Sequence, residues 1–365
     1  MKRRHFQFDS FLAVATGVLL VLGILILASV SAGFSQERFG RTTYYLFHQI
    51  LYGLIPGLIL GFIALKIKIS FFQKSAWVLM LLTLIFMVAV FIPGLGIISG
   101  GAPRWINLGF VTFQPSEFLK LSFIIYLSAW LANRADKKTS LLLPFLAVLA
   151  VVVVLLGFQS DLGTLVVIIA AALFMFFLSD SSIWHNILLI LICSGGLLAL
   201  IKFAPYRMKR ILVFLNPSLD PMGIGYQINQ ILIAIGSGGI LGLGLGMSSQ
   251  RFGFIPQTMA DSIFAIFAEE TGFIGSLVLI CLFLFFFWAS LRIAKKSKDK
   301  FSKLLVMGIS CWICIQAFVN VGAMIGLLPL TGIPLPFISY GGSHLVSELI
   351  GVGIILNISK SNKKW

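Results

Sequence analysis

The residues best suited to chemistry in this sequence are the carboxylates of one segment, RFGFIPQTMADSIFAIFAEETGFIG (251–275). The chain has only 12 acidic residues, and three of them, Asp261, Glu269 and Glu270, lie here at the start of an apolar run. Carboxylates beside a membrane core are costly and tend to mark functional positions. A pair of carboxylates that flanks one bond can supply acid and base catalysis, so the placement of these three decides what the segment can do.

Helix geometry separates the three acids. If Asp261 begins a continuous helix that ends near Arg292, the two glutamates lie about 12–13 Å deeper, rotated roughly 80° and 180° away. The carboxylates of a glycosidase lie about 5–10 Å apart across one bond, so these three cannot serve one reacting atom. We therefore predict that Asp261 lies alone at the outer surface and that Glu269 and Glu270 are structural.

These residues belong to an integral membrane protein. The 365 residues are 59% hydrophobic and 11% charged, whereas soluble domains are about 45–50% apolar and about 25% charged. The sequence predicts an all-α fold of ten transmembrane helices, because about 20 apolar residues cross about 30 Å of hydrocarbon. The predicted spans are 11–33, 44–65, 75–98, 116–133, 140–158, 161–179, 184–204, 262–291, 304–326 and 338–358.

The basic residues indicate the orientation. A net charge of +15 would suit nucleic acid, but Lys and Arg cluster in short loops between apolar runs, as the positive-inside rule describes. We therefore predict no nucleic-acid partner and a multi-pass protein of the cytoplasmic membrane with both termini cytoplasmic. The number of spans is then even, which excludes 226–246 as a further span. This glycine-rich stretch is expected to lie in the outer loop, or to dip into the outer leaflet, with close backbone approaches.

The connection between the seventh and eighth spans, about 205–260, is the one large extracytoplasmic loop. The sequence shows no soluble domain and no internal repeat, so residues 1–365 are predicted to form a single domain. Arg207, Lys209 and Arg210 lie in this loop, against the general charge pattern. Arginine binds phosphates with two parallel hydrogen bonds, so the three are candidates for an anionic ligand. Contact with lipid headgroups is the alternative.

Other polar residues have mainly structural interpretations. Glu117 and Lys120 are three apart, share a helix face and can pair. Asp161 is predicted to cap the sixth span, and a partnership with Lys120 is a second interpretation. Arg104 and Trp105 precede the fourth span, where Trp105 would suit an interfacial anchor.

The last outer turn, 326–344, carries three prolines and four glycines up to Gly342, and no acidic residue. Such a stiff, neutral segment suits the wall of a site, although turn chemistry alone explains it too. His344 and Glu348 are one helical turn apart, so a local hydrogen bond between them is expected. The four cysteines lie inside apolar spans, where packing is the expected role.

Six blocks along the chain resemble those of a known family. They are PRWINLG…QPSEFLKL, QSDLGT, FLNPSLDPMGIGYQINQ, AIGSGG, GLGLGMSSQRFGFIPQTMADSIFAIFAEETGFIG and QAFVNVGAMIGLLPLTGIPLPFISYGGS. In order, they resemble the signature blocks of the SEDS proteins, the FtsW, RodA and SpoVE membrane proteins of bacterial division, elongation and sporulation. GLGLGMSSQ and FLNPSLDP look more like the FtsW branch than the RodA branch. The resemblance covers nearly the whole chain.

The resemblance implies a ten-span peptidoglycan glycosyltransferase that polymerises lipid II on the outer face of the membrane. The essential aspartate of the family lies in a pattern like LPEAHTDFIFA, which matches IPQTMADSIFA here and assigns catalysis to Asp261. Gln257, Met259 and Ser262 depart from that pattern, as does Ser160, where the family has proline. The expected substrate-binding residues are Arg104, Trp105, Arg207, Lys209, Arg210 and Gln250.

A pyrophosphate leaving group makes a divalent cation, Mg or Mn, the expected cofactor beside the basic residues. The resemblance also implies partners. The expected partners are lipid II, a class B penicillin-binding protein and other division or elongation membrane proteins. Two further hypotheses stay open: a lipid II flippase, which needs polar residues along the whole membrane depth, and a scaffold without chemistry.

Overall fold

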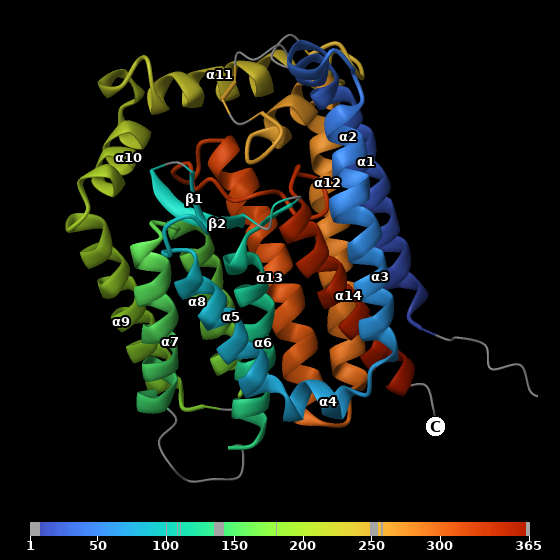
Figure 1. Cartoon of the computed structure of the whole chain (residues 1–365), viewed down its shortest axis with the longest axis vertical. Helices are drawn as coiled ribbons and strands as arrows, with labels where there is room; N and C mark the ends of the chain where they lie inside the picture. Colours follow the sequence, from blue (N-terminus) through green and yellow to red (C-terminus); the bar gives the residue numbers. More distant parts are fainter. Residues whose placement is uncertain are drawn as a thin grey trace, which may run out of the picture.

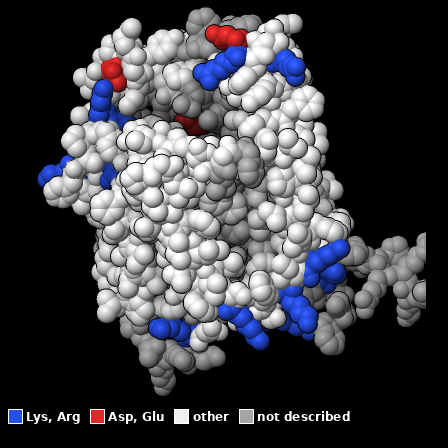
Figure 2. All heavy atoms as spheres, viewed as in Figure 1, with Lys and Arg blue, Asp and Glu red and all other residues white. Residues whose placement is uncertain are grey.

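The computed structural model describes residues 8–99, 101–107, 109, 111–134, 142–179, 181–248, 255–256 and 258–362. The described chain is an upright bundle of helices, with one helix, α11, lying across one end (Figure 1). We call this end the α11 end and the opposite one, where the short helix α4 (Ile69–Lys74) lies, the α4 end. In Figure 2, basic side chains lie toward both ends of the face and acidic side chains toward the α11 end, with an uncharged belt between them.

Each of the ten predicted spans coincides with a helical segment. These are α1 (Ser10–Phe39), α2, η1 and α3 (Tyr44–Gln49, Ile50–Leu54 and Ile55–Lys66), α5 (Ala76–Ala89), α6 (Pro115–Ala132), α7 (Leu142–Phe158), α8 (Leu162–Phe177), α9 (Ile183–Lys202), α12 (Ile263–Lys296), α13 (Lys300–Met324) and α14 (Gly342–Asn362). Within the described residues, 6 helices are long and apolar enough to cross a membrane, and α5, α7 and α8 are shorter apolar helices. The all-α membrane fold is confirmed, while the exact number of crossings stays a prediction.

The predicted span 75–98 is too long. Helix α5 ends at Ala89 because Pro93 and Gly94, which has a φ of 85°, cannot continue it. The chain then forms a small antiparallel sheet of β1 (Gly96–Ser99), β2 (Ala102–Asn107) and β3 (Thr112–Phe113) in the order β1-β2-β3. This sheet lies toward the α11 end of the bundle (Figure 1) and carries Arg104 and Trp105 there.

The loop between α9 and α12 contains α10 (Pro205–Leu215), the short helix η2 (Pro217–Leu219) and α11 (Ile224–Ser237). Helix α11 runs across the end of the bundle and not along it (Figure 1). The prediction that 226–246 does not add a span is therefore consistent with the fold. Its first half is a regular amphipathic helix that packs against α12.

Helix α12 is interrupted at Gly272, whose φ of 67° and ψ of −163° are not helical. The carbonyls of Glu269 and Glu270 accept backbone hydrogen bonds of 3.0 Å each from the amides of Leu243 and Gly244, in the loop that follows α11. Peptide groups of that loop thus satisfy the groups that the broken helix leaves open. The prediction of one continuous helix is wrong, and depth along it cannot be counted from its far end.

Glycines of the same loop permit this close approach. A Cβ added to Gly242 would lie 2.2 Å from the carbonyl oxygen of Glu270, and one added to Gly238 would lie 2.3 Å from that of Ala268. No side chain fits at such distances. The predicted use of glycine for close backbone approach is confirmed at these two positions.

Helix α13 lies in the interior and packs against α6, α8, α12 and α14. Its span is the most buried of the candidate spans, and Trp312 is among the largest fully buried side chains. The four cysteines are free. Cys311 and Cys314 are buried in this helix, as the packing interpretation predicts, whereas Cys193 is half-buried and Cys281 is exposed. Polar side chains on such a buried helix can fix neighbouring backbone segments by hydrogen bonds.

Candidate functional site

Asp261 lies in the turn that precedes α12, at the α11 end, and its side chain is buried. Only 8% of the residue is exposed, so the prediction of a carboxylate on the open surface is wrong. The connection between α13 and α14 (325–341) covers it: a Cβ added to Gly332 would lie 3.7 Å from Asp261 Oδ2. The face in Figure 2 is hollowed toward this end, and acidic atoms are visible inside the hollow.

Two neighbouring elements fix the backbone of this turn. Asn320 of α13 donates from Nδ2 to the carbonyl of Asp261 at 2.7 Å and to that of Ile333 at 2.8 Å. The amide of Tyr340 donates to the carbonyl of Met259 at 2.8 Å. The stiff, proline-rich connection that the sequence suggested as a site wall therefore contacts the aspartate turn directly.

Burial raises the pKa of the Asp261 carboxyl to about 6, although nearby Arg210 and hydrogen bonds from its own amide and from Ser262 oppose the rise. The Ser262 hydroxyl lies 3.4 Å from Asp261 Oδ1. A carboxylate with a pKa near 6 is still ionised at neutral pH, yet it accepts a proton more readily than a surface aspartate. This is the property that a general base needs.

The three cations of the α9–α12 loop have different environments. Arg207 is buried and donates to the carbonyls of Leu200 at 3.0 Å and Gly157 at 2.9 Å, so its guanidinium joins the ends of α9 and α7. Lys209 pairs with Asp220 at 3.1 Å while its side chain remains 57% exposed. Arg207 thus holds the loop, and Lys209 lies at the surface.

Arg210 faces the site. It donates to the carbonyl of Leu330 in the α13–α14 connection at 3.4 Å, and its charge acts on Asp261. Of the three predicted cations, it is the one that reaches the connection covering the aspartate. A carboxylate and a guanidinium held at the same connection offer both a proton acceptor and a binding group for an anion.

Of the two predicted sheet residues, Trp105 lines a second pocket and Arg104 holds the sheet in place. Arg104 donates to the carbonyls of Gln159 at 3.1 Å and Ser160 at 2.7 Å, which ties β2 to the turn before α8. Trp105 lines a pocket of about 180 Å³ together with Tyr340 and the start of α14. Because the amide of Tyr340 binds the aspartate turn, this pocket adjoins the Asp261 site. The last predicted substrate residue, Gln250, lies outside the described residues.

A buried ion pair lies deeper in the bundle. Lys120 Nζ is 2.8 Å from Glu117 Oε2, which confirms the predicted pair. The ammonium also donates to Gln316 Oε1 at 2.6 Å, and Gln316 donates from Nε2 to the carbonyl of Pro334 at 3.0 Å. The pair is therefore linked through one amide to the connection that covers Asp261.

Asp161 forms one of the two contacts predicted for it. Asp161 caps α8 by accepting from the amide of Thr164 at 3.1 Å, as predicted. No ion pair joins it to Lys120 in the described part of the chain, because its second oxygen lies 3.4 Å from the Ser116 hydroxyl and Lys120 is engaged elsewhere.

The prediction of a hydrogen bond between His344 and Glu348 is also wrong. Glu348 Oε2 instead accepts from the amide of Phe337 at 2.8 Å, because the α13–α14 connection folds back onto the helix. Neither His344 Nε2 nor Glu348 Oε1 has a hydrogen-bond partner among the described residues.

Glu269 and Glu270 are buried and bind two different neighbours. Glu269 accepts from the hydroxyl of Ser248, and Glu270 accepts from Ser29 of α1 at 2.9 Å. These contacts agree with the structural role expected for the two glutamates. The Glu117–Lys120 pair instead has Gln316 of α13 as its neighbour.

Sequence reasoning missed two polar residues of α13, Gln316 and Asn320. They are four apart inside the predicted span 304–326 and therefore lie on one helix face. A polar face inside an apolar span is a signal that could have found them. Among the described residues there is no group of three or more His, Cys, Asp and Glu side chains that could hold a metal ion.

Comparison with known proteins identifies the family. The model of the FtsW/RodA/SpoVE family, described as cell cycle protein, matches residues 10–364. The chain belongs to this family. The resemblance read from the six sequence blocks is thereby confirmed.

Two relatives show how much of the chain is shared within the FtsW/RodA/SpoVE family. Stage V sporulation protein E of Bacillus subtilis is 37% identical over 358 residues, which cover 97% of this chain and 98% of that protein. A protein of Nitrosococcus halophilus named "Probable peptidoglycan glycosyltransferase FtsW" is 38% identical over 358 residues, which cover 96% and 92%.

Solved structures agree with the fold. A chain of the structure described as "Structural coordination of polymerization and crosslinking by a peptidoglycan synthase complex" matches with a TM-score of 0.82 and 25% identity, over 98% of this chain and 99% of that chain. The rod shape determining protein RodA of Thermus thermophilus matches with a TM-score of 0.71 at 24% identity, over 98% of each chain. The helical membrane fold of the FtsW/RodA/SpoVE family thus extends over the whole chain.

Proposed function

We propose that this protein is a peptidoglycan glycosyltransferase that polymerises lipid II into glycan strands at the outer face of the bacterial cytoplasmic membrane. One observation carries the proposal: Asp261 is buried at one end of a membrane helix bundle, under the α13–α14 connection to which Arg210 also donates a hydrogen bond. The names of the relatives, which include peptidoglycan glycosyltransferases, support this assignment.

The proposed reaction is a displacement with inversion. Asp261 accepts the proton of the 4-hydroxyl of the acceptor N-acetylglucosamine, and that oxygen attacks the anomeric carbon of the donor. The bond from that carbon to the undecaprenyl pyrophosphate breaks, and the electron pair leaves with the phosphate oxygen. A single carboxylate suffices, because the leaving group needs charge neutralisation more than protonation.

Arg210 is the first candidate for binding the pyrophosphate, because its side chain reaches the connection that covers Asp261 and its charge acts on that carboxyl. Lys209 is exposed at the surface of the same helix and is a candidate for the approach of the anion. Arg104 and Arg207 donate to backbone carbonyls, so we assign them to holding the sheet and the loop that surround the site. The Trp105 pocket is a candidate subsite for the substrate beside the aspartate.

A divalent cation would fit this site only if the protein and the substrate both supplied ligands to it. Mg²⁺ is commonly bound by one or two carboxylates together with substrate phosphates, and not by a full cage of protein groups. Asp261 supplies one such carboxylate, and a bound ion would neutralise charge on the pyrophosphate. In this proposal Asp261 accepts the proton, and Arg210 binds and orients the pyrophosphate.

The proposed orientation places both termini in the cytoplasm and the α11 end outside. The clustering of Lys and Arg in short loops supports it. The likeness to a chain of a peptidoglycan synthase complex supports a class B penicillin-binding protein as the partner that crosslinks the strands.

The test is polymerisation of labelled lipid II by purified protein, with and without such a partner. Glycan ladders on a gel support the enzyme. Translocation of lipid II across liposome membranes without ladders would mean that the protein is a flippase, and neither activity would mean a scaffold. A flippase would need polar residues along the whole membrane depth.

A further inference from the structure

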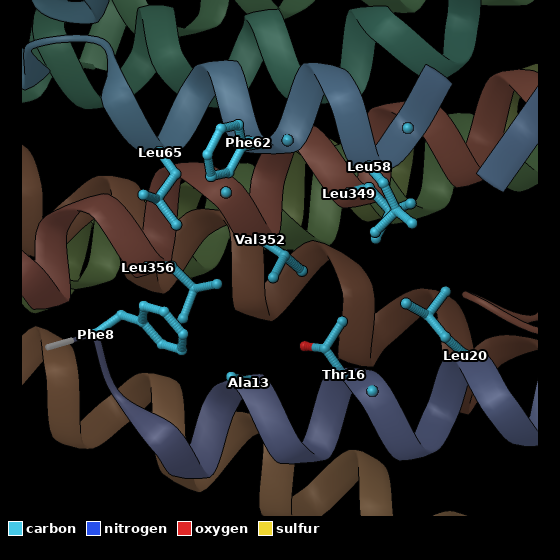
Figure 3. Close-up of a pocket in the computed structure, with 14 residues that line it drawn as sticks. Phe8, Ala13, Thr16, Leu20, Leu58, Phe62, Leu65, Leu349, Val352 and Leu356 are labelled. Atoms are coloured by element: carbon cyan, nitrogen blue, oxygen red, sulfur yellow. The ribbon is translucent and has the colours of Figure 1, made fainter. Parts of the chain in front are cut away.

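An apolar groove of about 600 Å³ opens between α1, α3 and α14, at the α4 end of the bundle. Figure 3 shows side chains of all three helices facing one common space. The volume lies within the range of small-molecule pockets, about 300–1,000 Å³. The groove uses none of the residues of the Asp261 site.

The groove lies at the opposite end of α12 from Asp261. Asp9, the residue that caps α1, binds Arg292 near the last turn of α12. Asp261 precedes the first residue of α12, Ile263, whereas Arg292 lies close to its last residue, Lys296. A ligand in this groove is therefore separate from the reacting groups.

The surface of the groove suits a hydrocarbon chain. Gly17 of α1 faces open space, with nothing within 4 Å of an added Cβ, so this glycine has no packing reason and leaves room for an occupant. Thr16 is the one hydroxyl in the lining, and it donates to the carbonyl of Leu12 in its own helix at 2.9 Å. The described lining thus has no free polar side-chain group to recognise a peptide or a sugar.

Charge at the rim indicates which lipid. Lys66, in the last turn of α3, holds its ammonium 4.1 Å from the ring centroid of Phe62, a lining residue. Lys66 and Lys68 are exposed, and basic side chains gather at this end of the molecule (Figure 2). A cation above an apolar groove at a membrane surface complements an anionic headgroup above its acyl chains.

We propose that this groove binds an anionic glycerophospholipid, with one acyl chain along Gly17 and the phosphate at Lys66. Every lipid-facing groove contains hydrocarbon. The open glycine and the cation at the rim make this one selective. The bound chain fills the space between α1 and α3, and the headgroup joins the end of α3 to the membrane surface.

The test is native mass spectrometry of delipidated protein with equal amounts of palmitoyl-oleoyl phosphatidylglycerol and phosphatidylethanolamine. We expect phosphatidylglycerol to be preferred about fivefold, the factor that one basic residue contributes near an anionic lipid surface. Lys66→Gln should abolish the preference, while Lys303→Gln, an exposed lysine at the start of α13, should keep it.

Variants whose larger side chains occupy the groove provide a second test. Gly17→Leu and Ala13→Phe should lose most of the retained phosphatidylglycerol, whereas Gly196→Leu should retain it, since Gly196 of α9 also faces open space. Equal binding of the two lipids, or unchanged binding by both filling variants, would overturn the proposal. So would displacement of phosphatidylglycerol by equimolar undecaprenyl phosphate, which assigns the groove to the substrate chain, or a loss of dimers in Gly17→Leu, which assigns it to a second copy. None of these measurements depends on lipid II polymerisation.

Discussion

The side-chain amide of Asn320 donates a hydrogen bond of 2.7 Å to the backbone carbonyl of Asp261. Its second hydrogen bond, of 2.8 Å, goes to Ile333 in the α13–α14 connection. One buried side chain therefore fixes both the turn that carries the candidate base and the segment that covers it. The turn that carries the carboxylate is therefore held by a side chain of a different helix, α13.

Replacing Asn320 tests this positioning. Asn320→Leu leaves two buried carbonyls without donors, and each such loss costs about 1–3 kcal/mol. A displacement of about 1 Å at a reacting group can reduce the rate about 100-fold, so we expect at least a tenfold drop in lipid II polymerisation. Ser310→Ala is the matched control, since that buried hydroxyl of α13 donates only within its own helix.

The measurement must distinguish a displaced Asp261 carboxylate from an unfolded protein. Asn320→Leu should retain a cooperative thermal transition in detergent while activity falls. Wild-type activity in Asn320→Leu, or equal loss in the Ser310→Ala control, would contradict the positioning role.

Activity should fall in acid with a midpoint near pH 6. The base must be ionised to accept a proton, and burial raises the pKa of Asp261 to about 6. Lowering the pH through this value protonates the carboxylate and removes the base. Initial rates of polymerisation between pH 5 and pH 8 at saturating lipid II measure it. A rate unchanged down to pH 5 would show that another group accepts the proton.

The buried pair of Glu117 and Lys120 should be fragile to single changes. Glu117→Gln leaves the ammonium of Lys120 buried without its counter-charge, which costs about 3–5 kcal/mol. The double variant Glu117→Gln with Lys120→Met removes both charges and should recover much of the thermal stability. If the double variant unfolds at the same temperature as Glu117→Gln, or below it, the ion pair is not what stabilises this region.

Gly242 should tolerate no side chain. A Cβ there would lie 2.2 Å from the Glu270 carbonyl oxygen, and the residue has a φ of 82°. Gly242→Ala should therefore lower both the thermal midpoint and activity by releasing the loop from the break in α12. Gly236→Ala is the matched control, because Gly236 lies in α11 with open space around it. There, alanine should be neutral or stabilising by about 0.5–1 kcal/mol. Equal effects of the two changes would argue against the docked loop.

The sequence allows prediction of features that depend on local spacing. The helical segments follow from apolar runs, the Asp161 cap from its place before an apolar helix, and the Glu117–Lys120 pair from a separation of three residues. Each of these is decided within one or two turns of helix. Composition and charge placement then give the membrane class.

The features that escaped prediction depend on segments far apart in the chain. The burial of Asp261 comes from Gly332 and its neighbours, about 70 residues further on. The break at Gly272 is stable because the loop after α11 supplies its hydrogen bonds. The different environments of Arg207 and Arg210 depend on which carbonyls their helix meets. No local pattern contains these contacts.

If Asp261 is the base, Asp261→Asn should remove activity without removing the fold. The raised pKa means that the folded state binds a proton more tightly than the unfolded state between pH 3.8 and about 6. Stability is therefore lost as the pH rises through this window. At pH 7.5 the neutral amide removes a cost of roughly 2–3 kcal/mol, so the variant should unfold at the same temperature as wild type or higher.

The decisive measurement is polymerisation of labelled lipid II by Asp261→Asn at pH 7.5, beside its thermal unfolding curve. We expect no glycan ladder from a protein that is at least as stable as wild type. A ladder formed at the wild-type rate by the folded variant would contradict it.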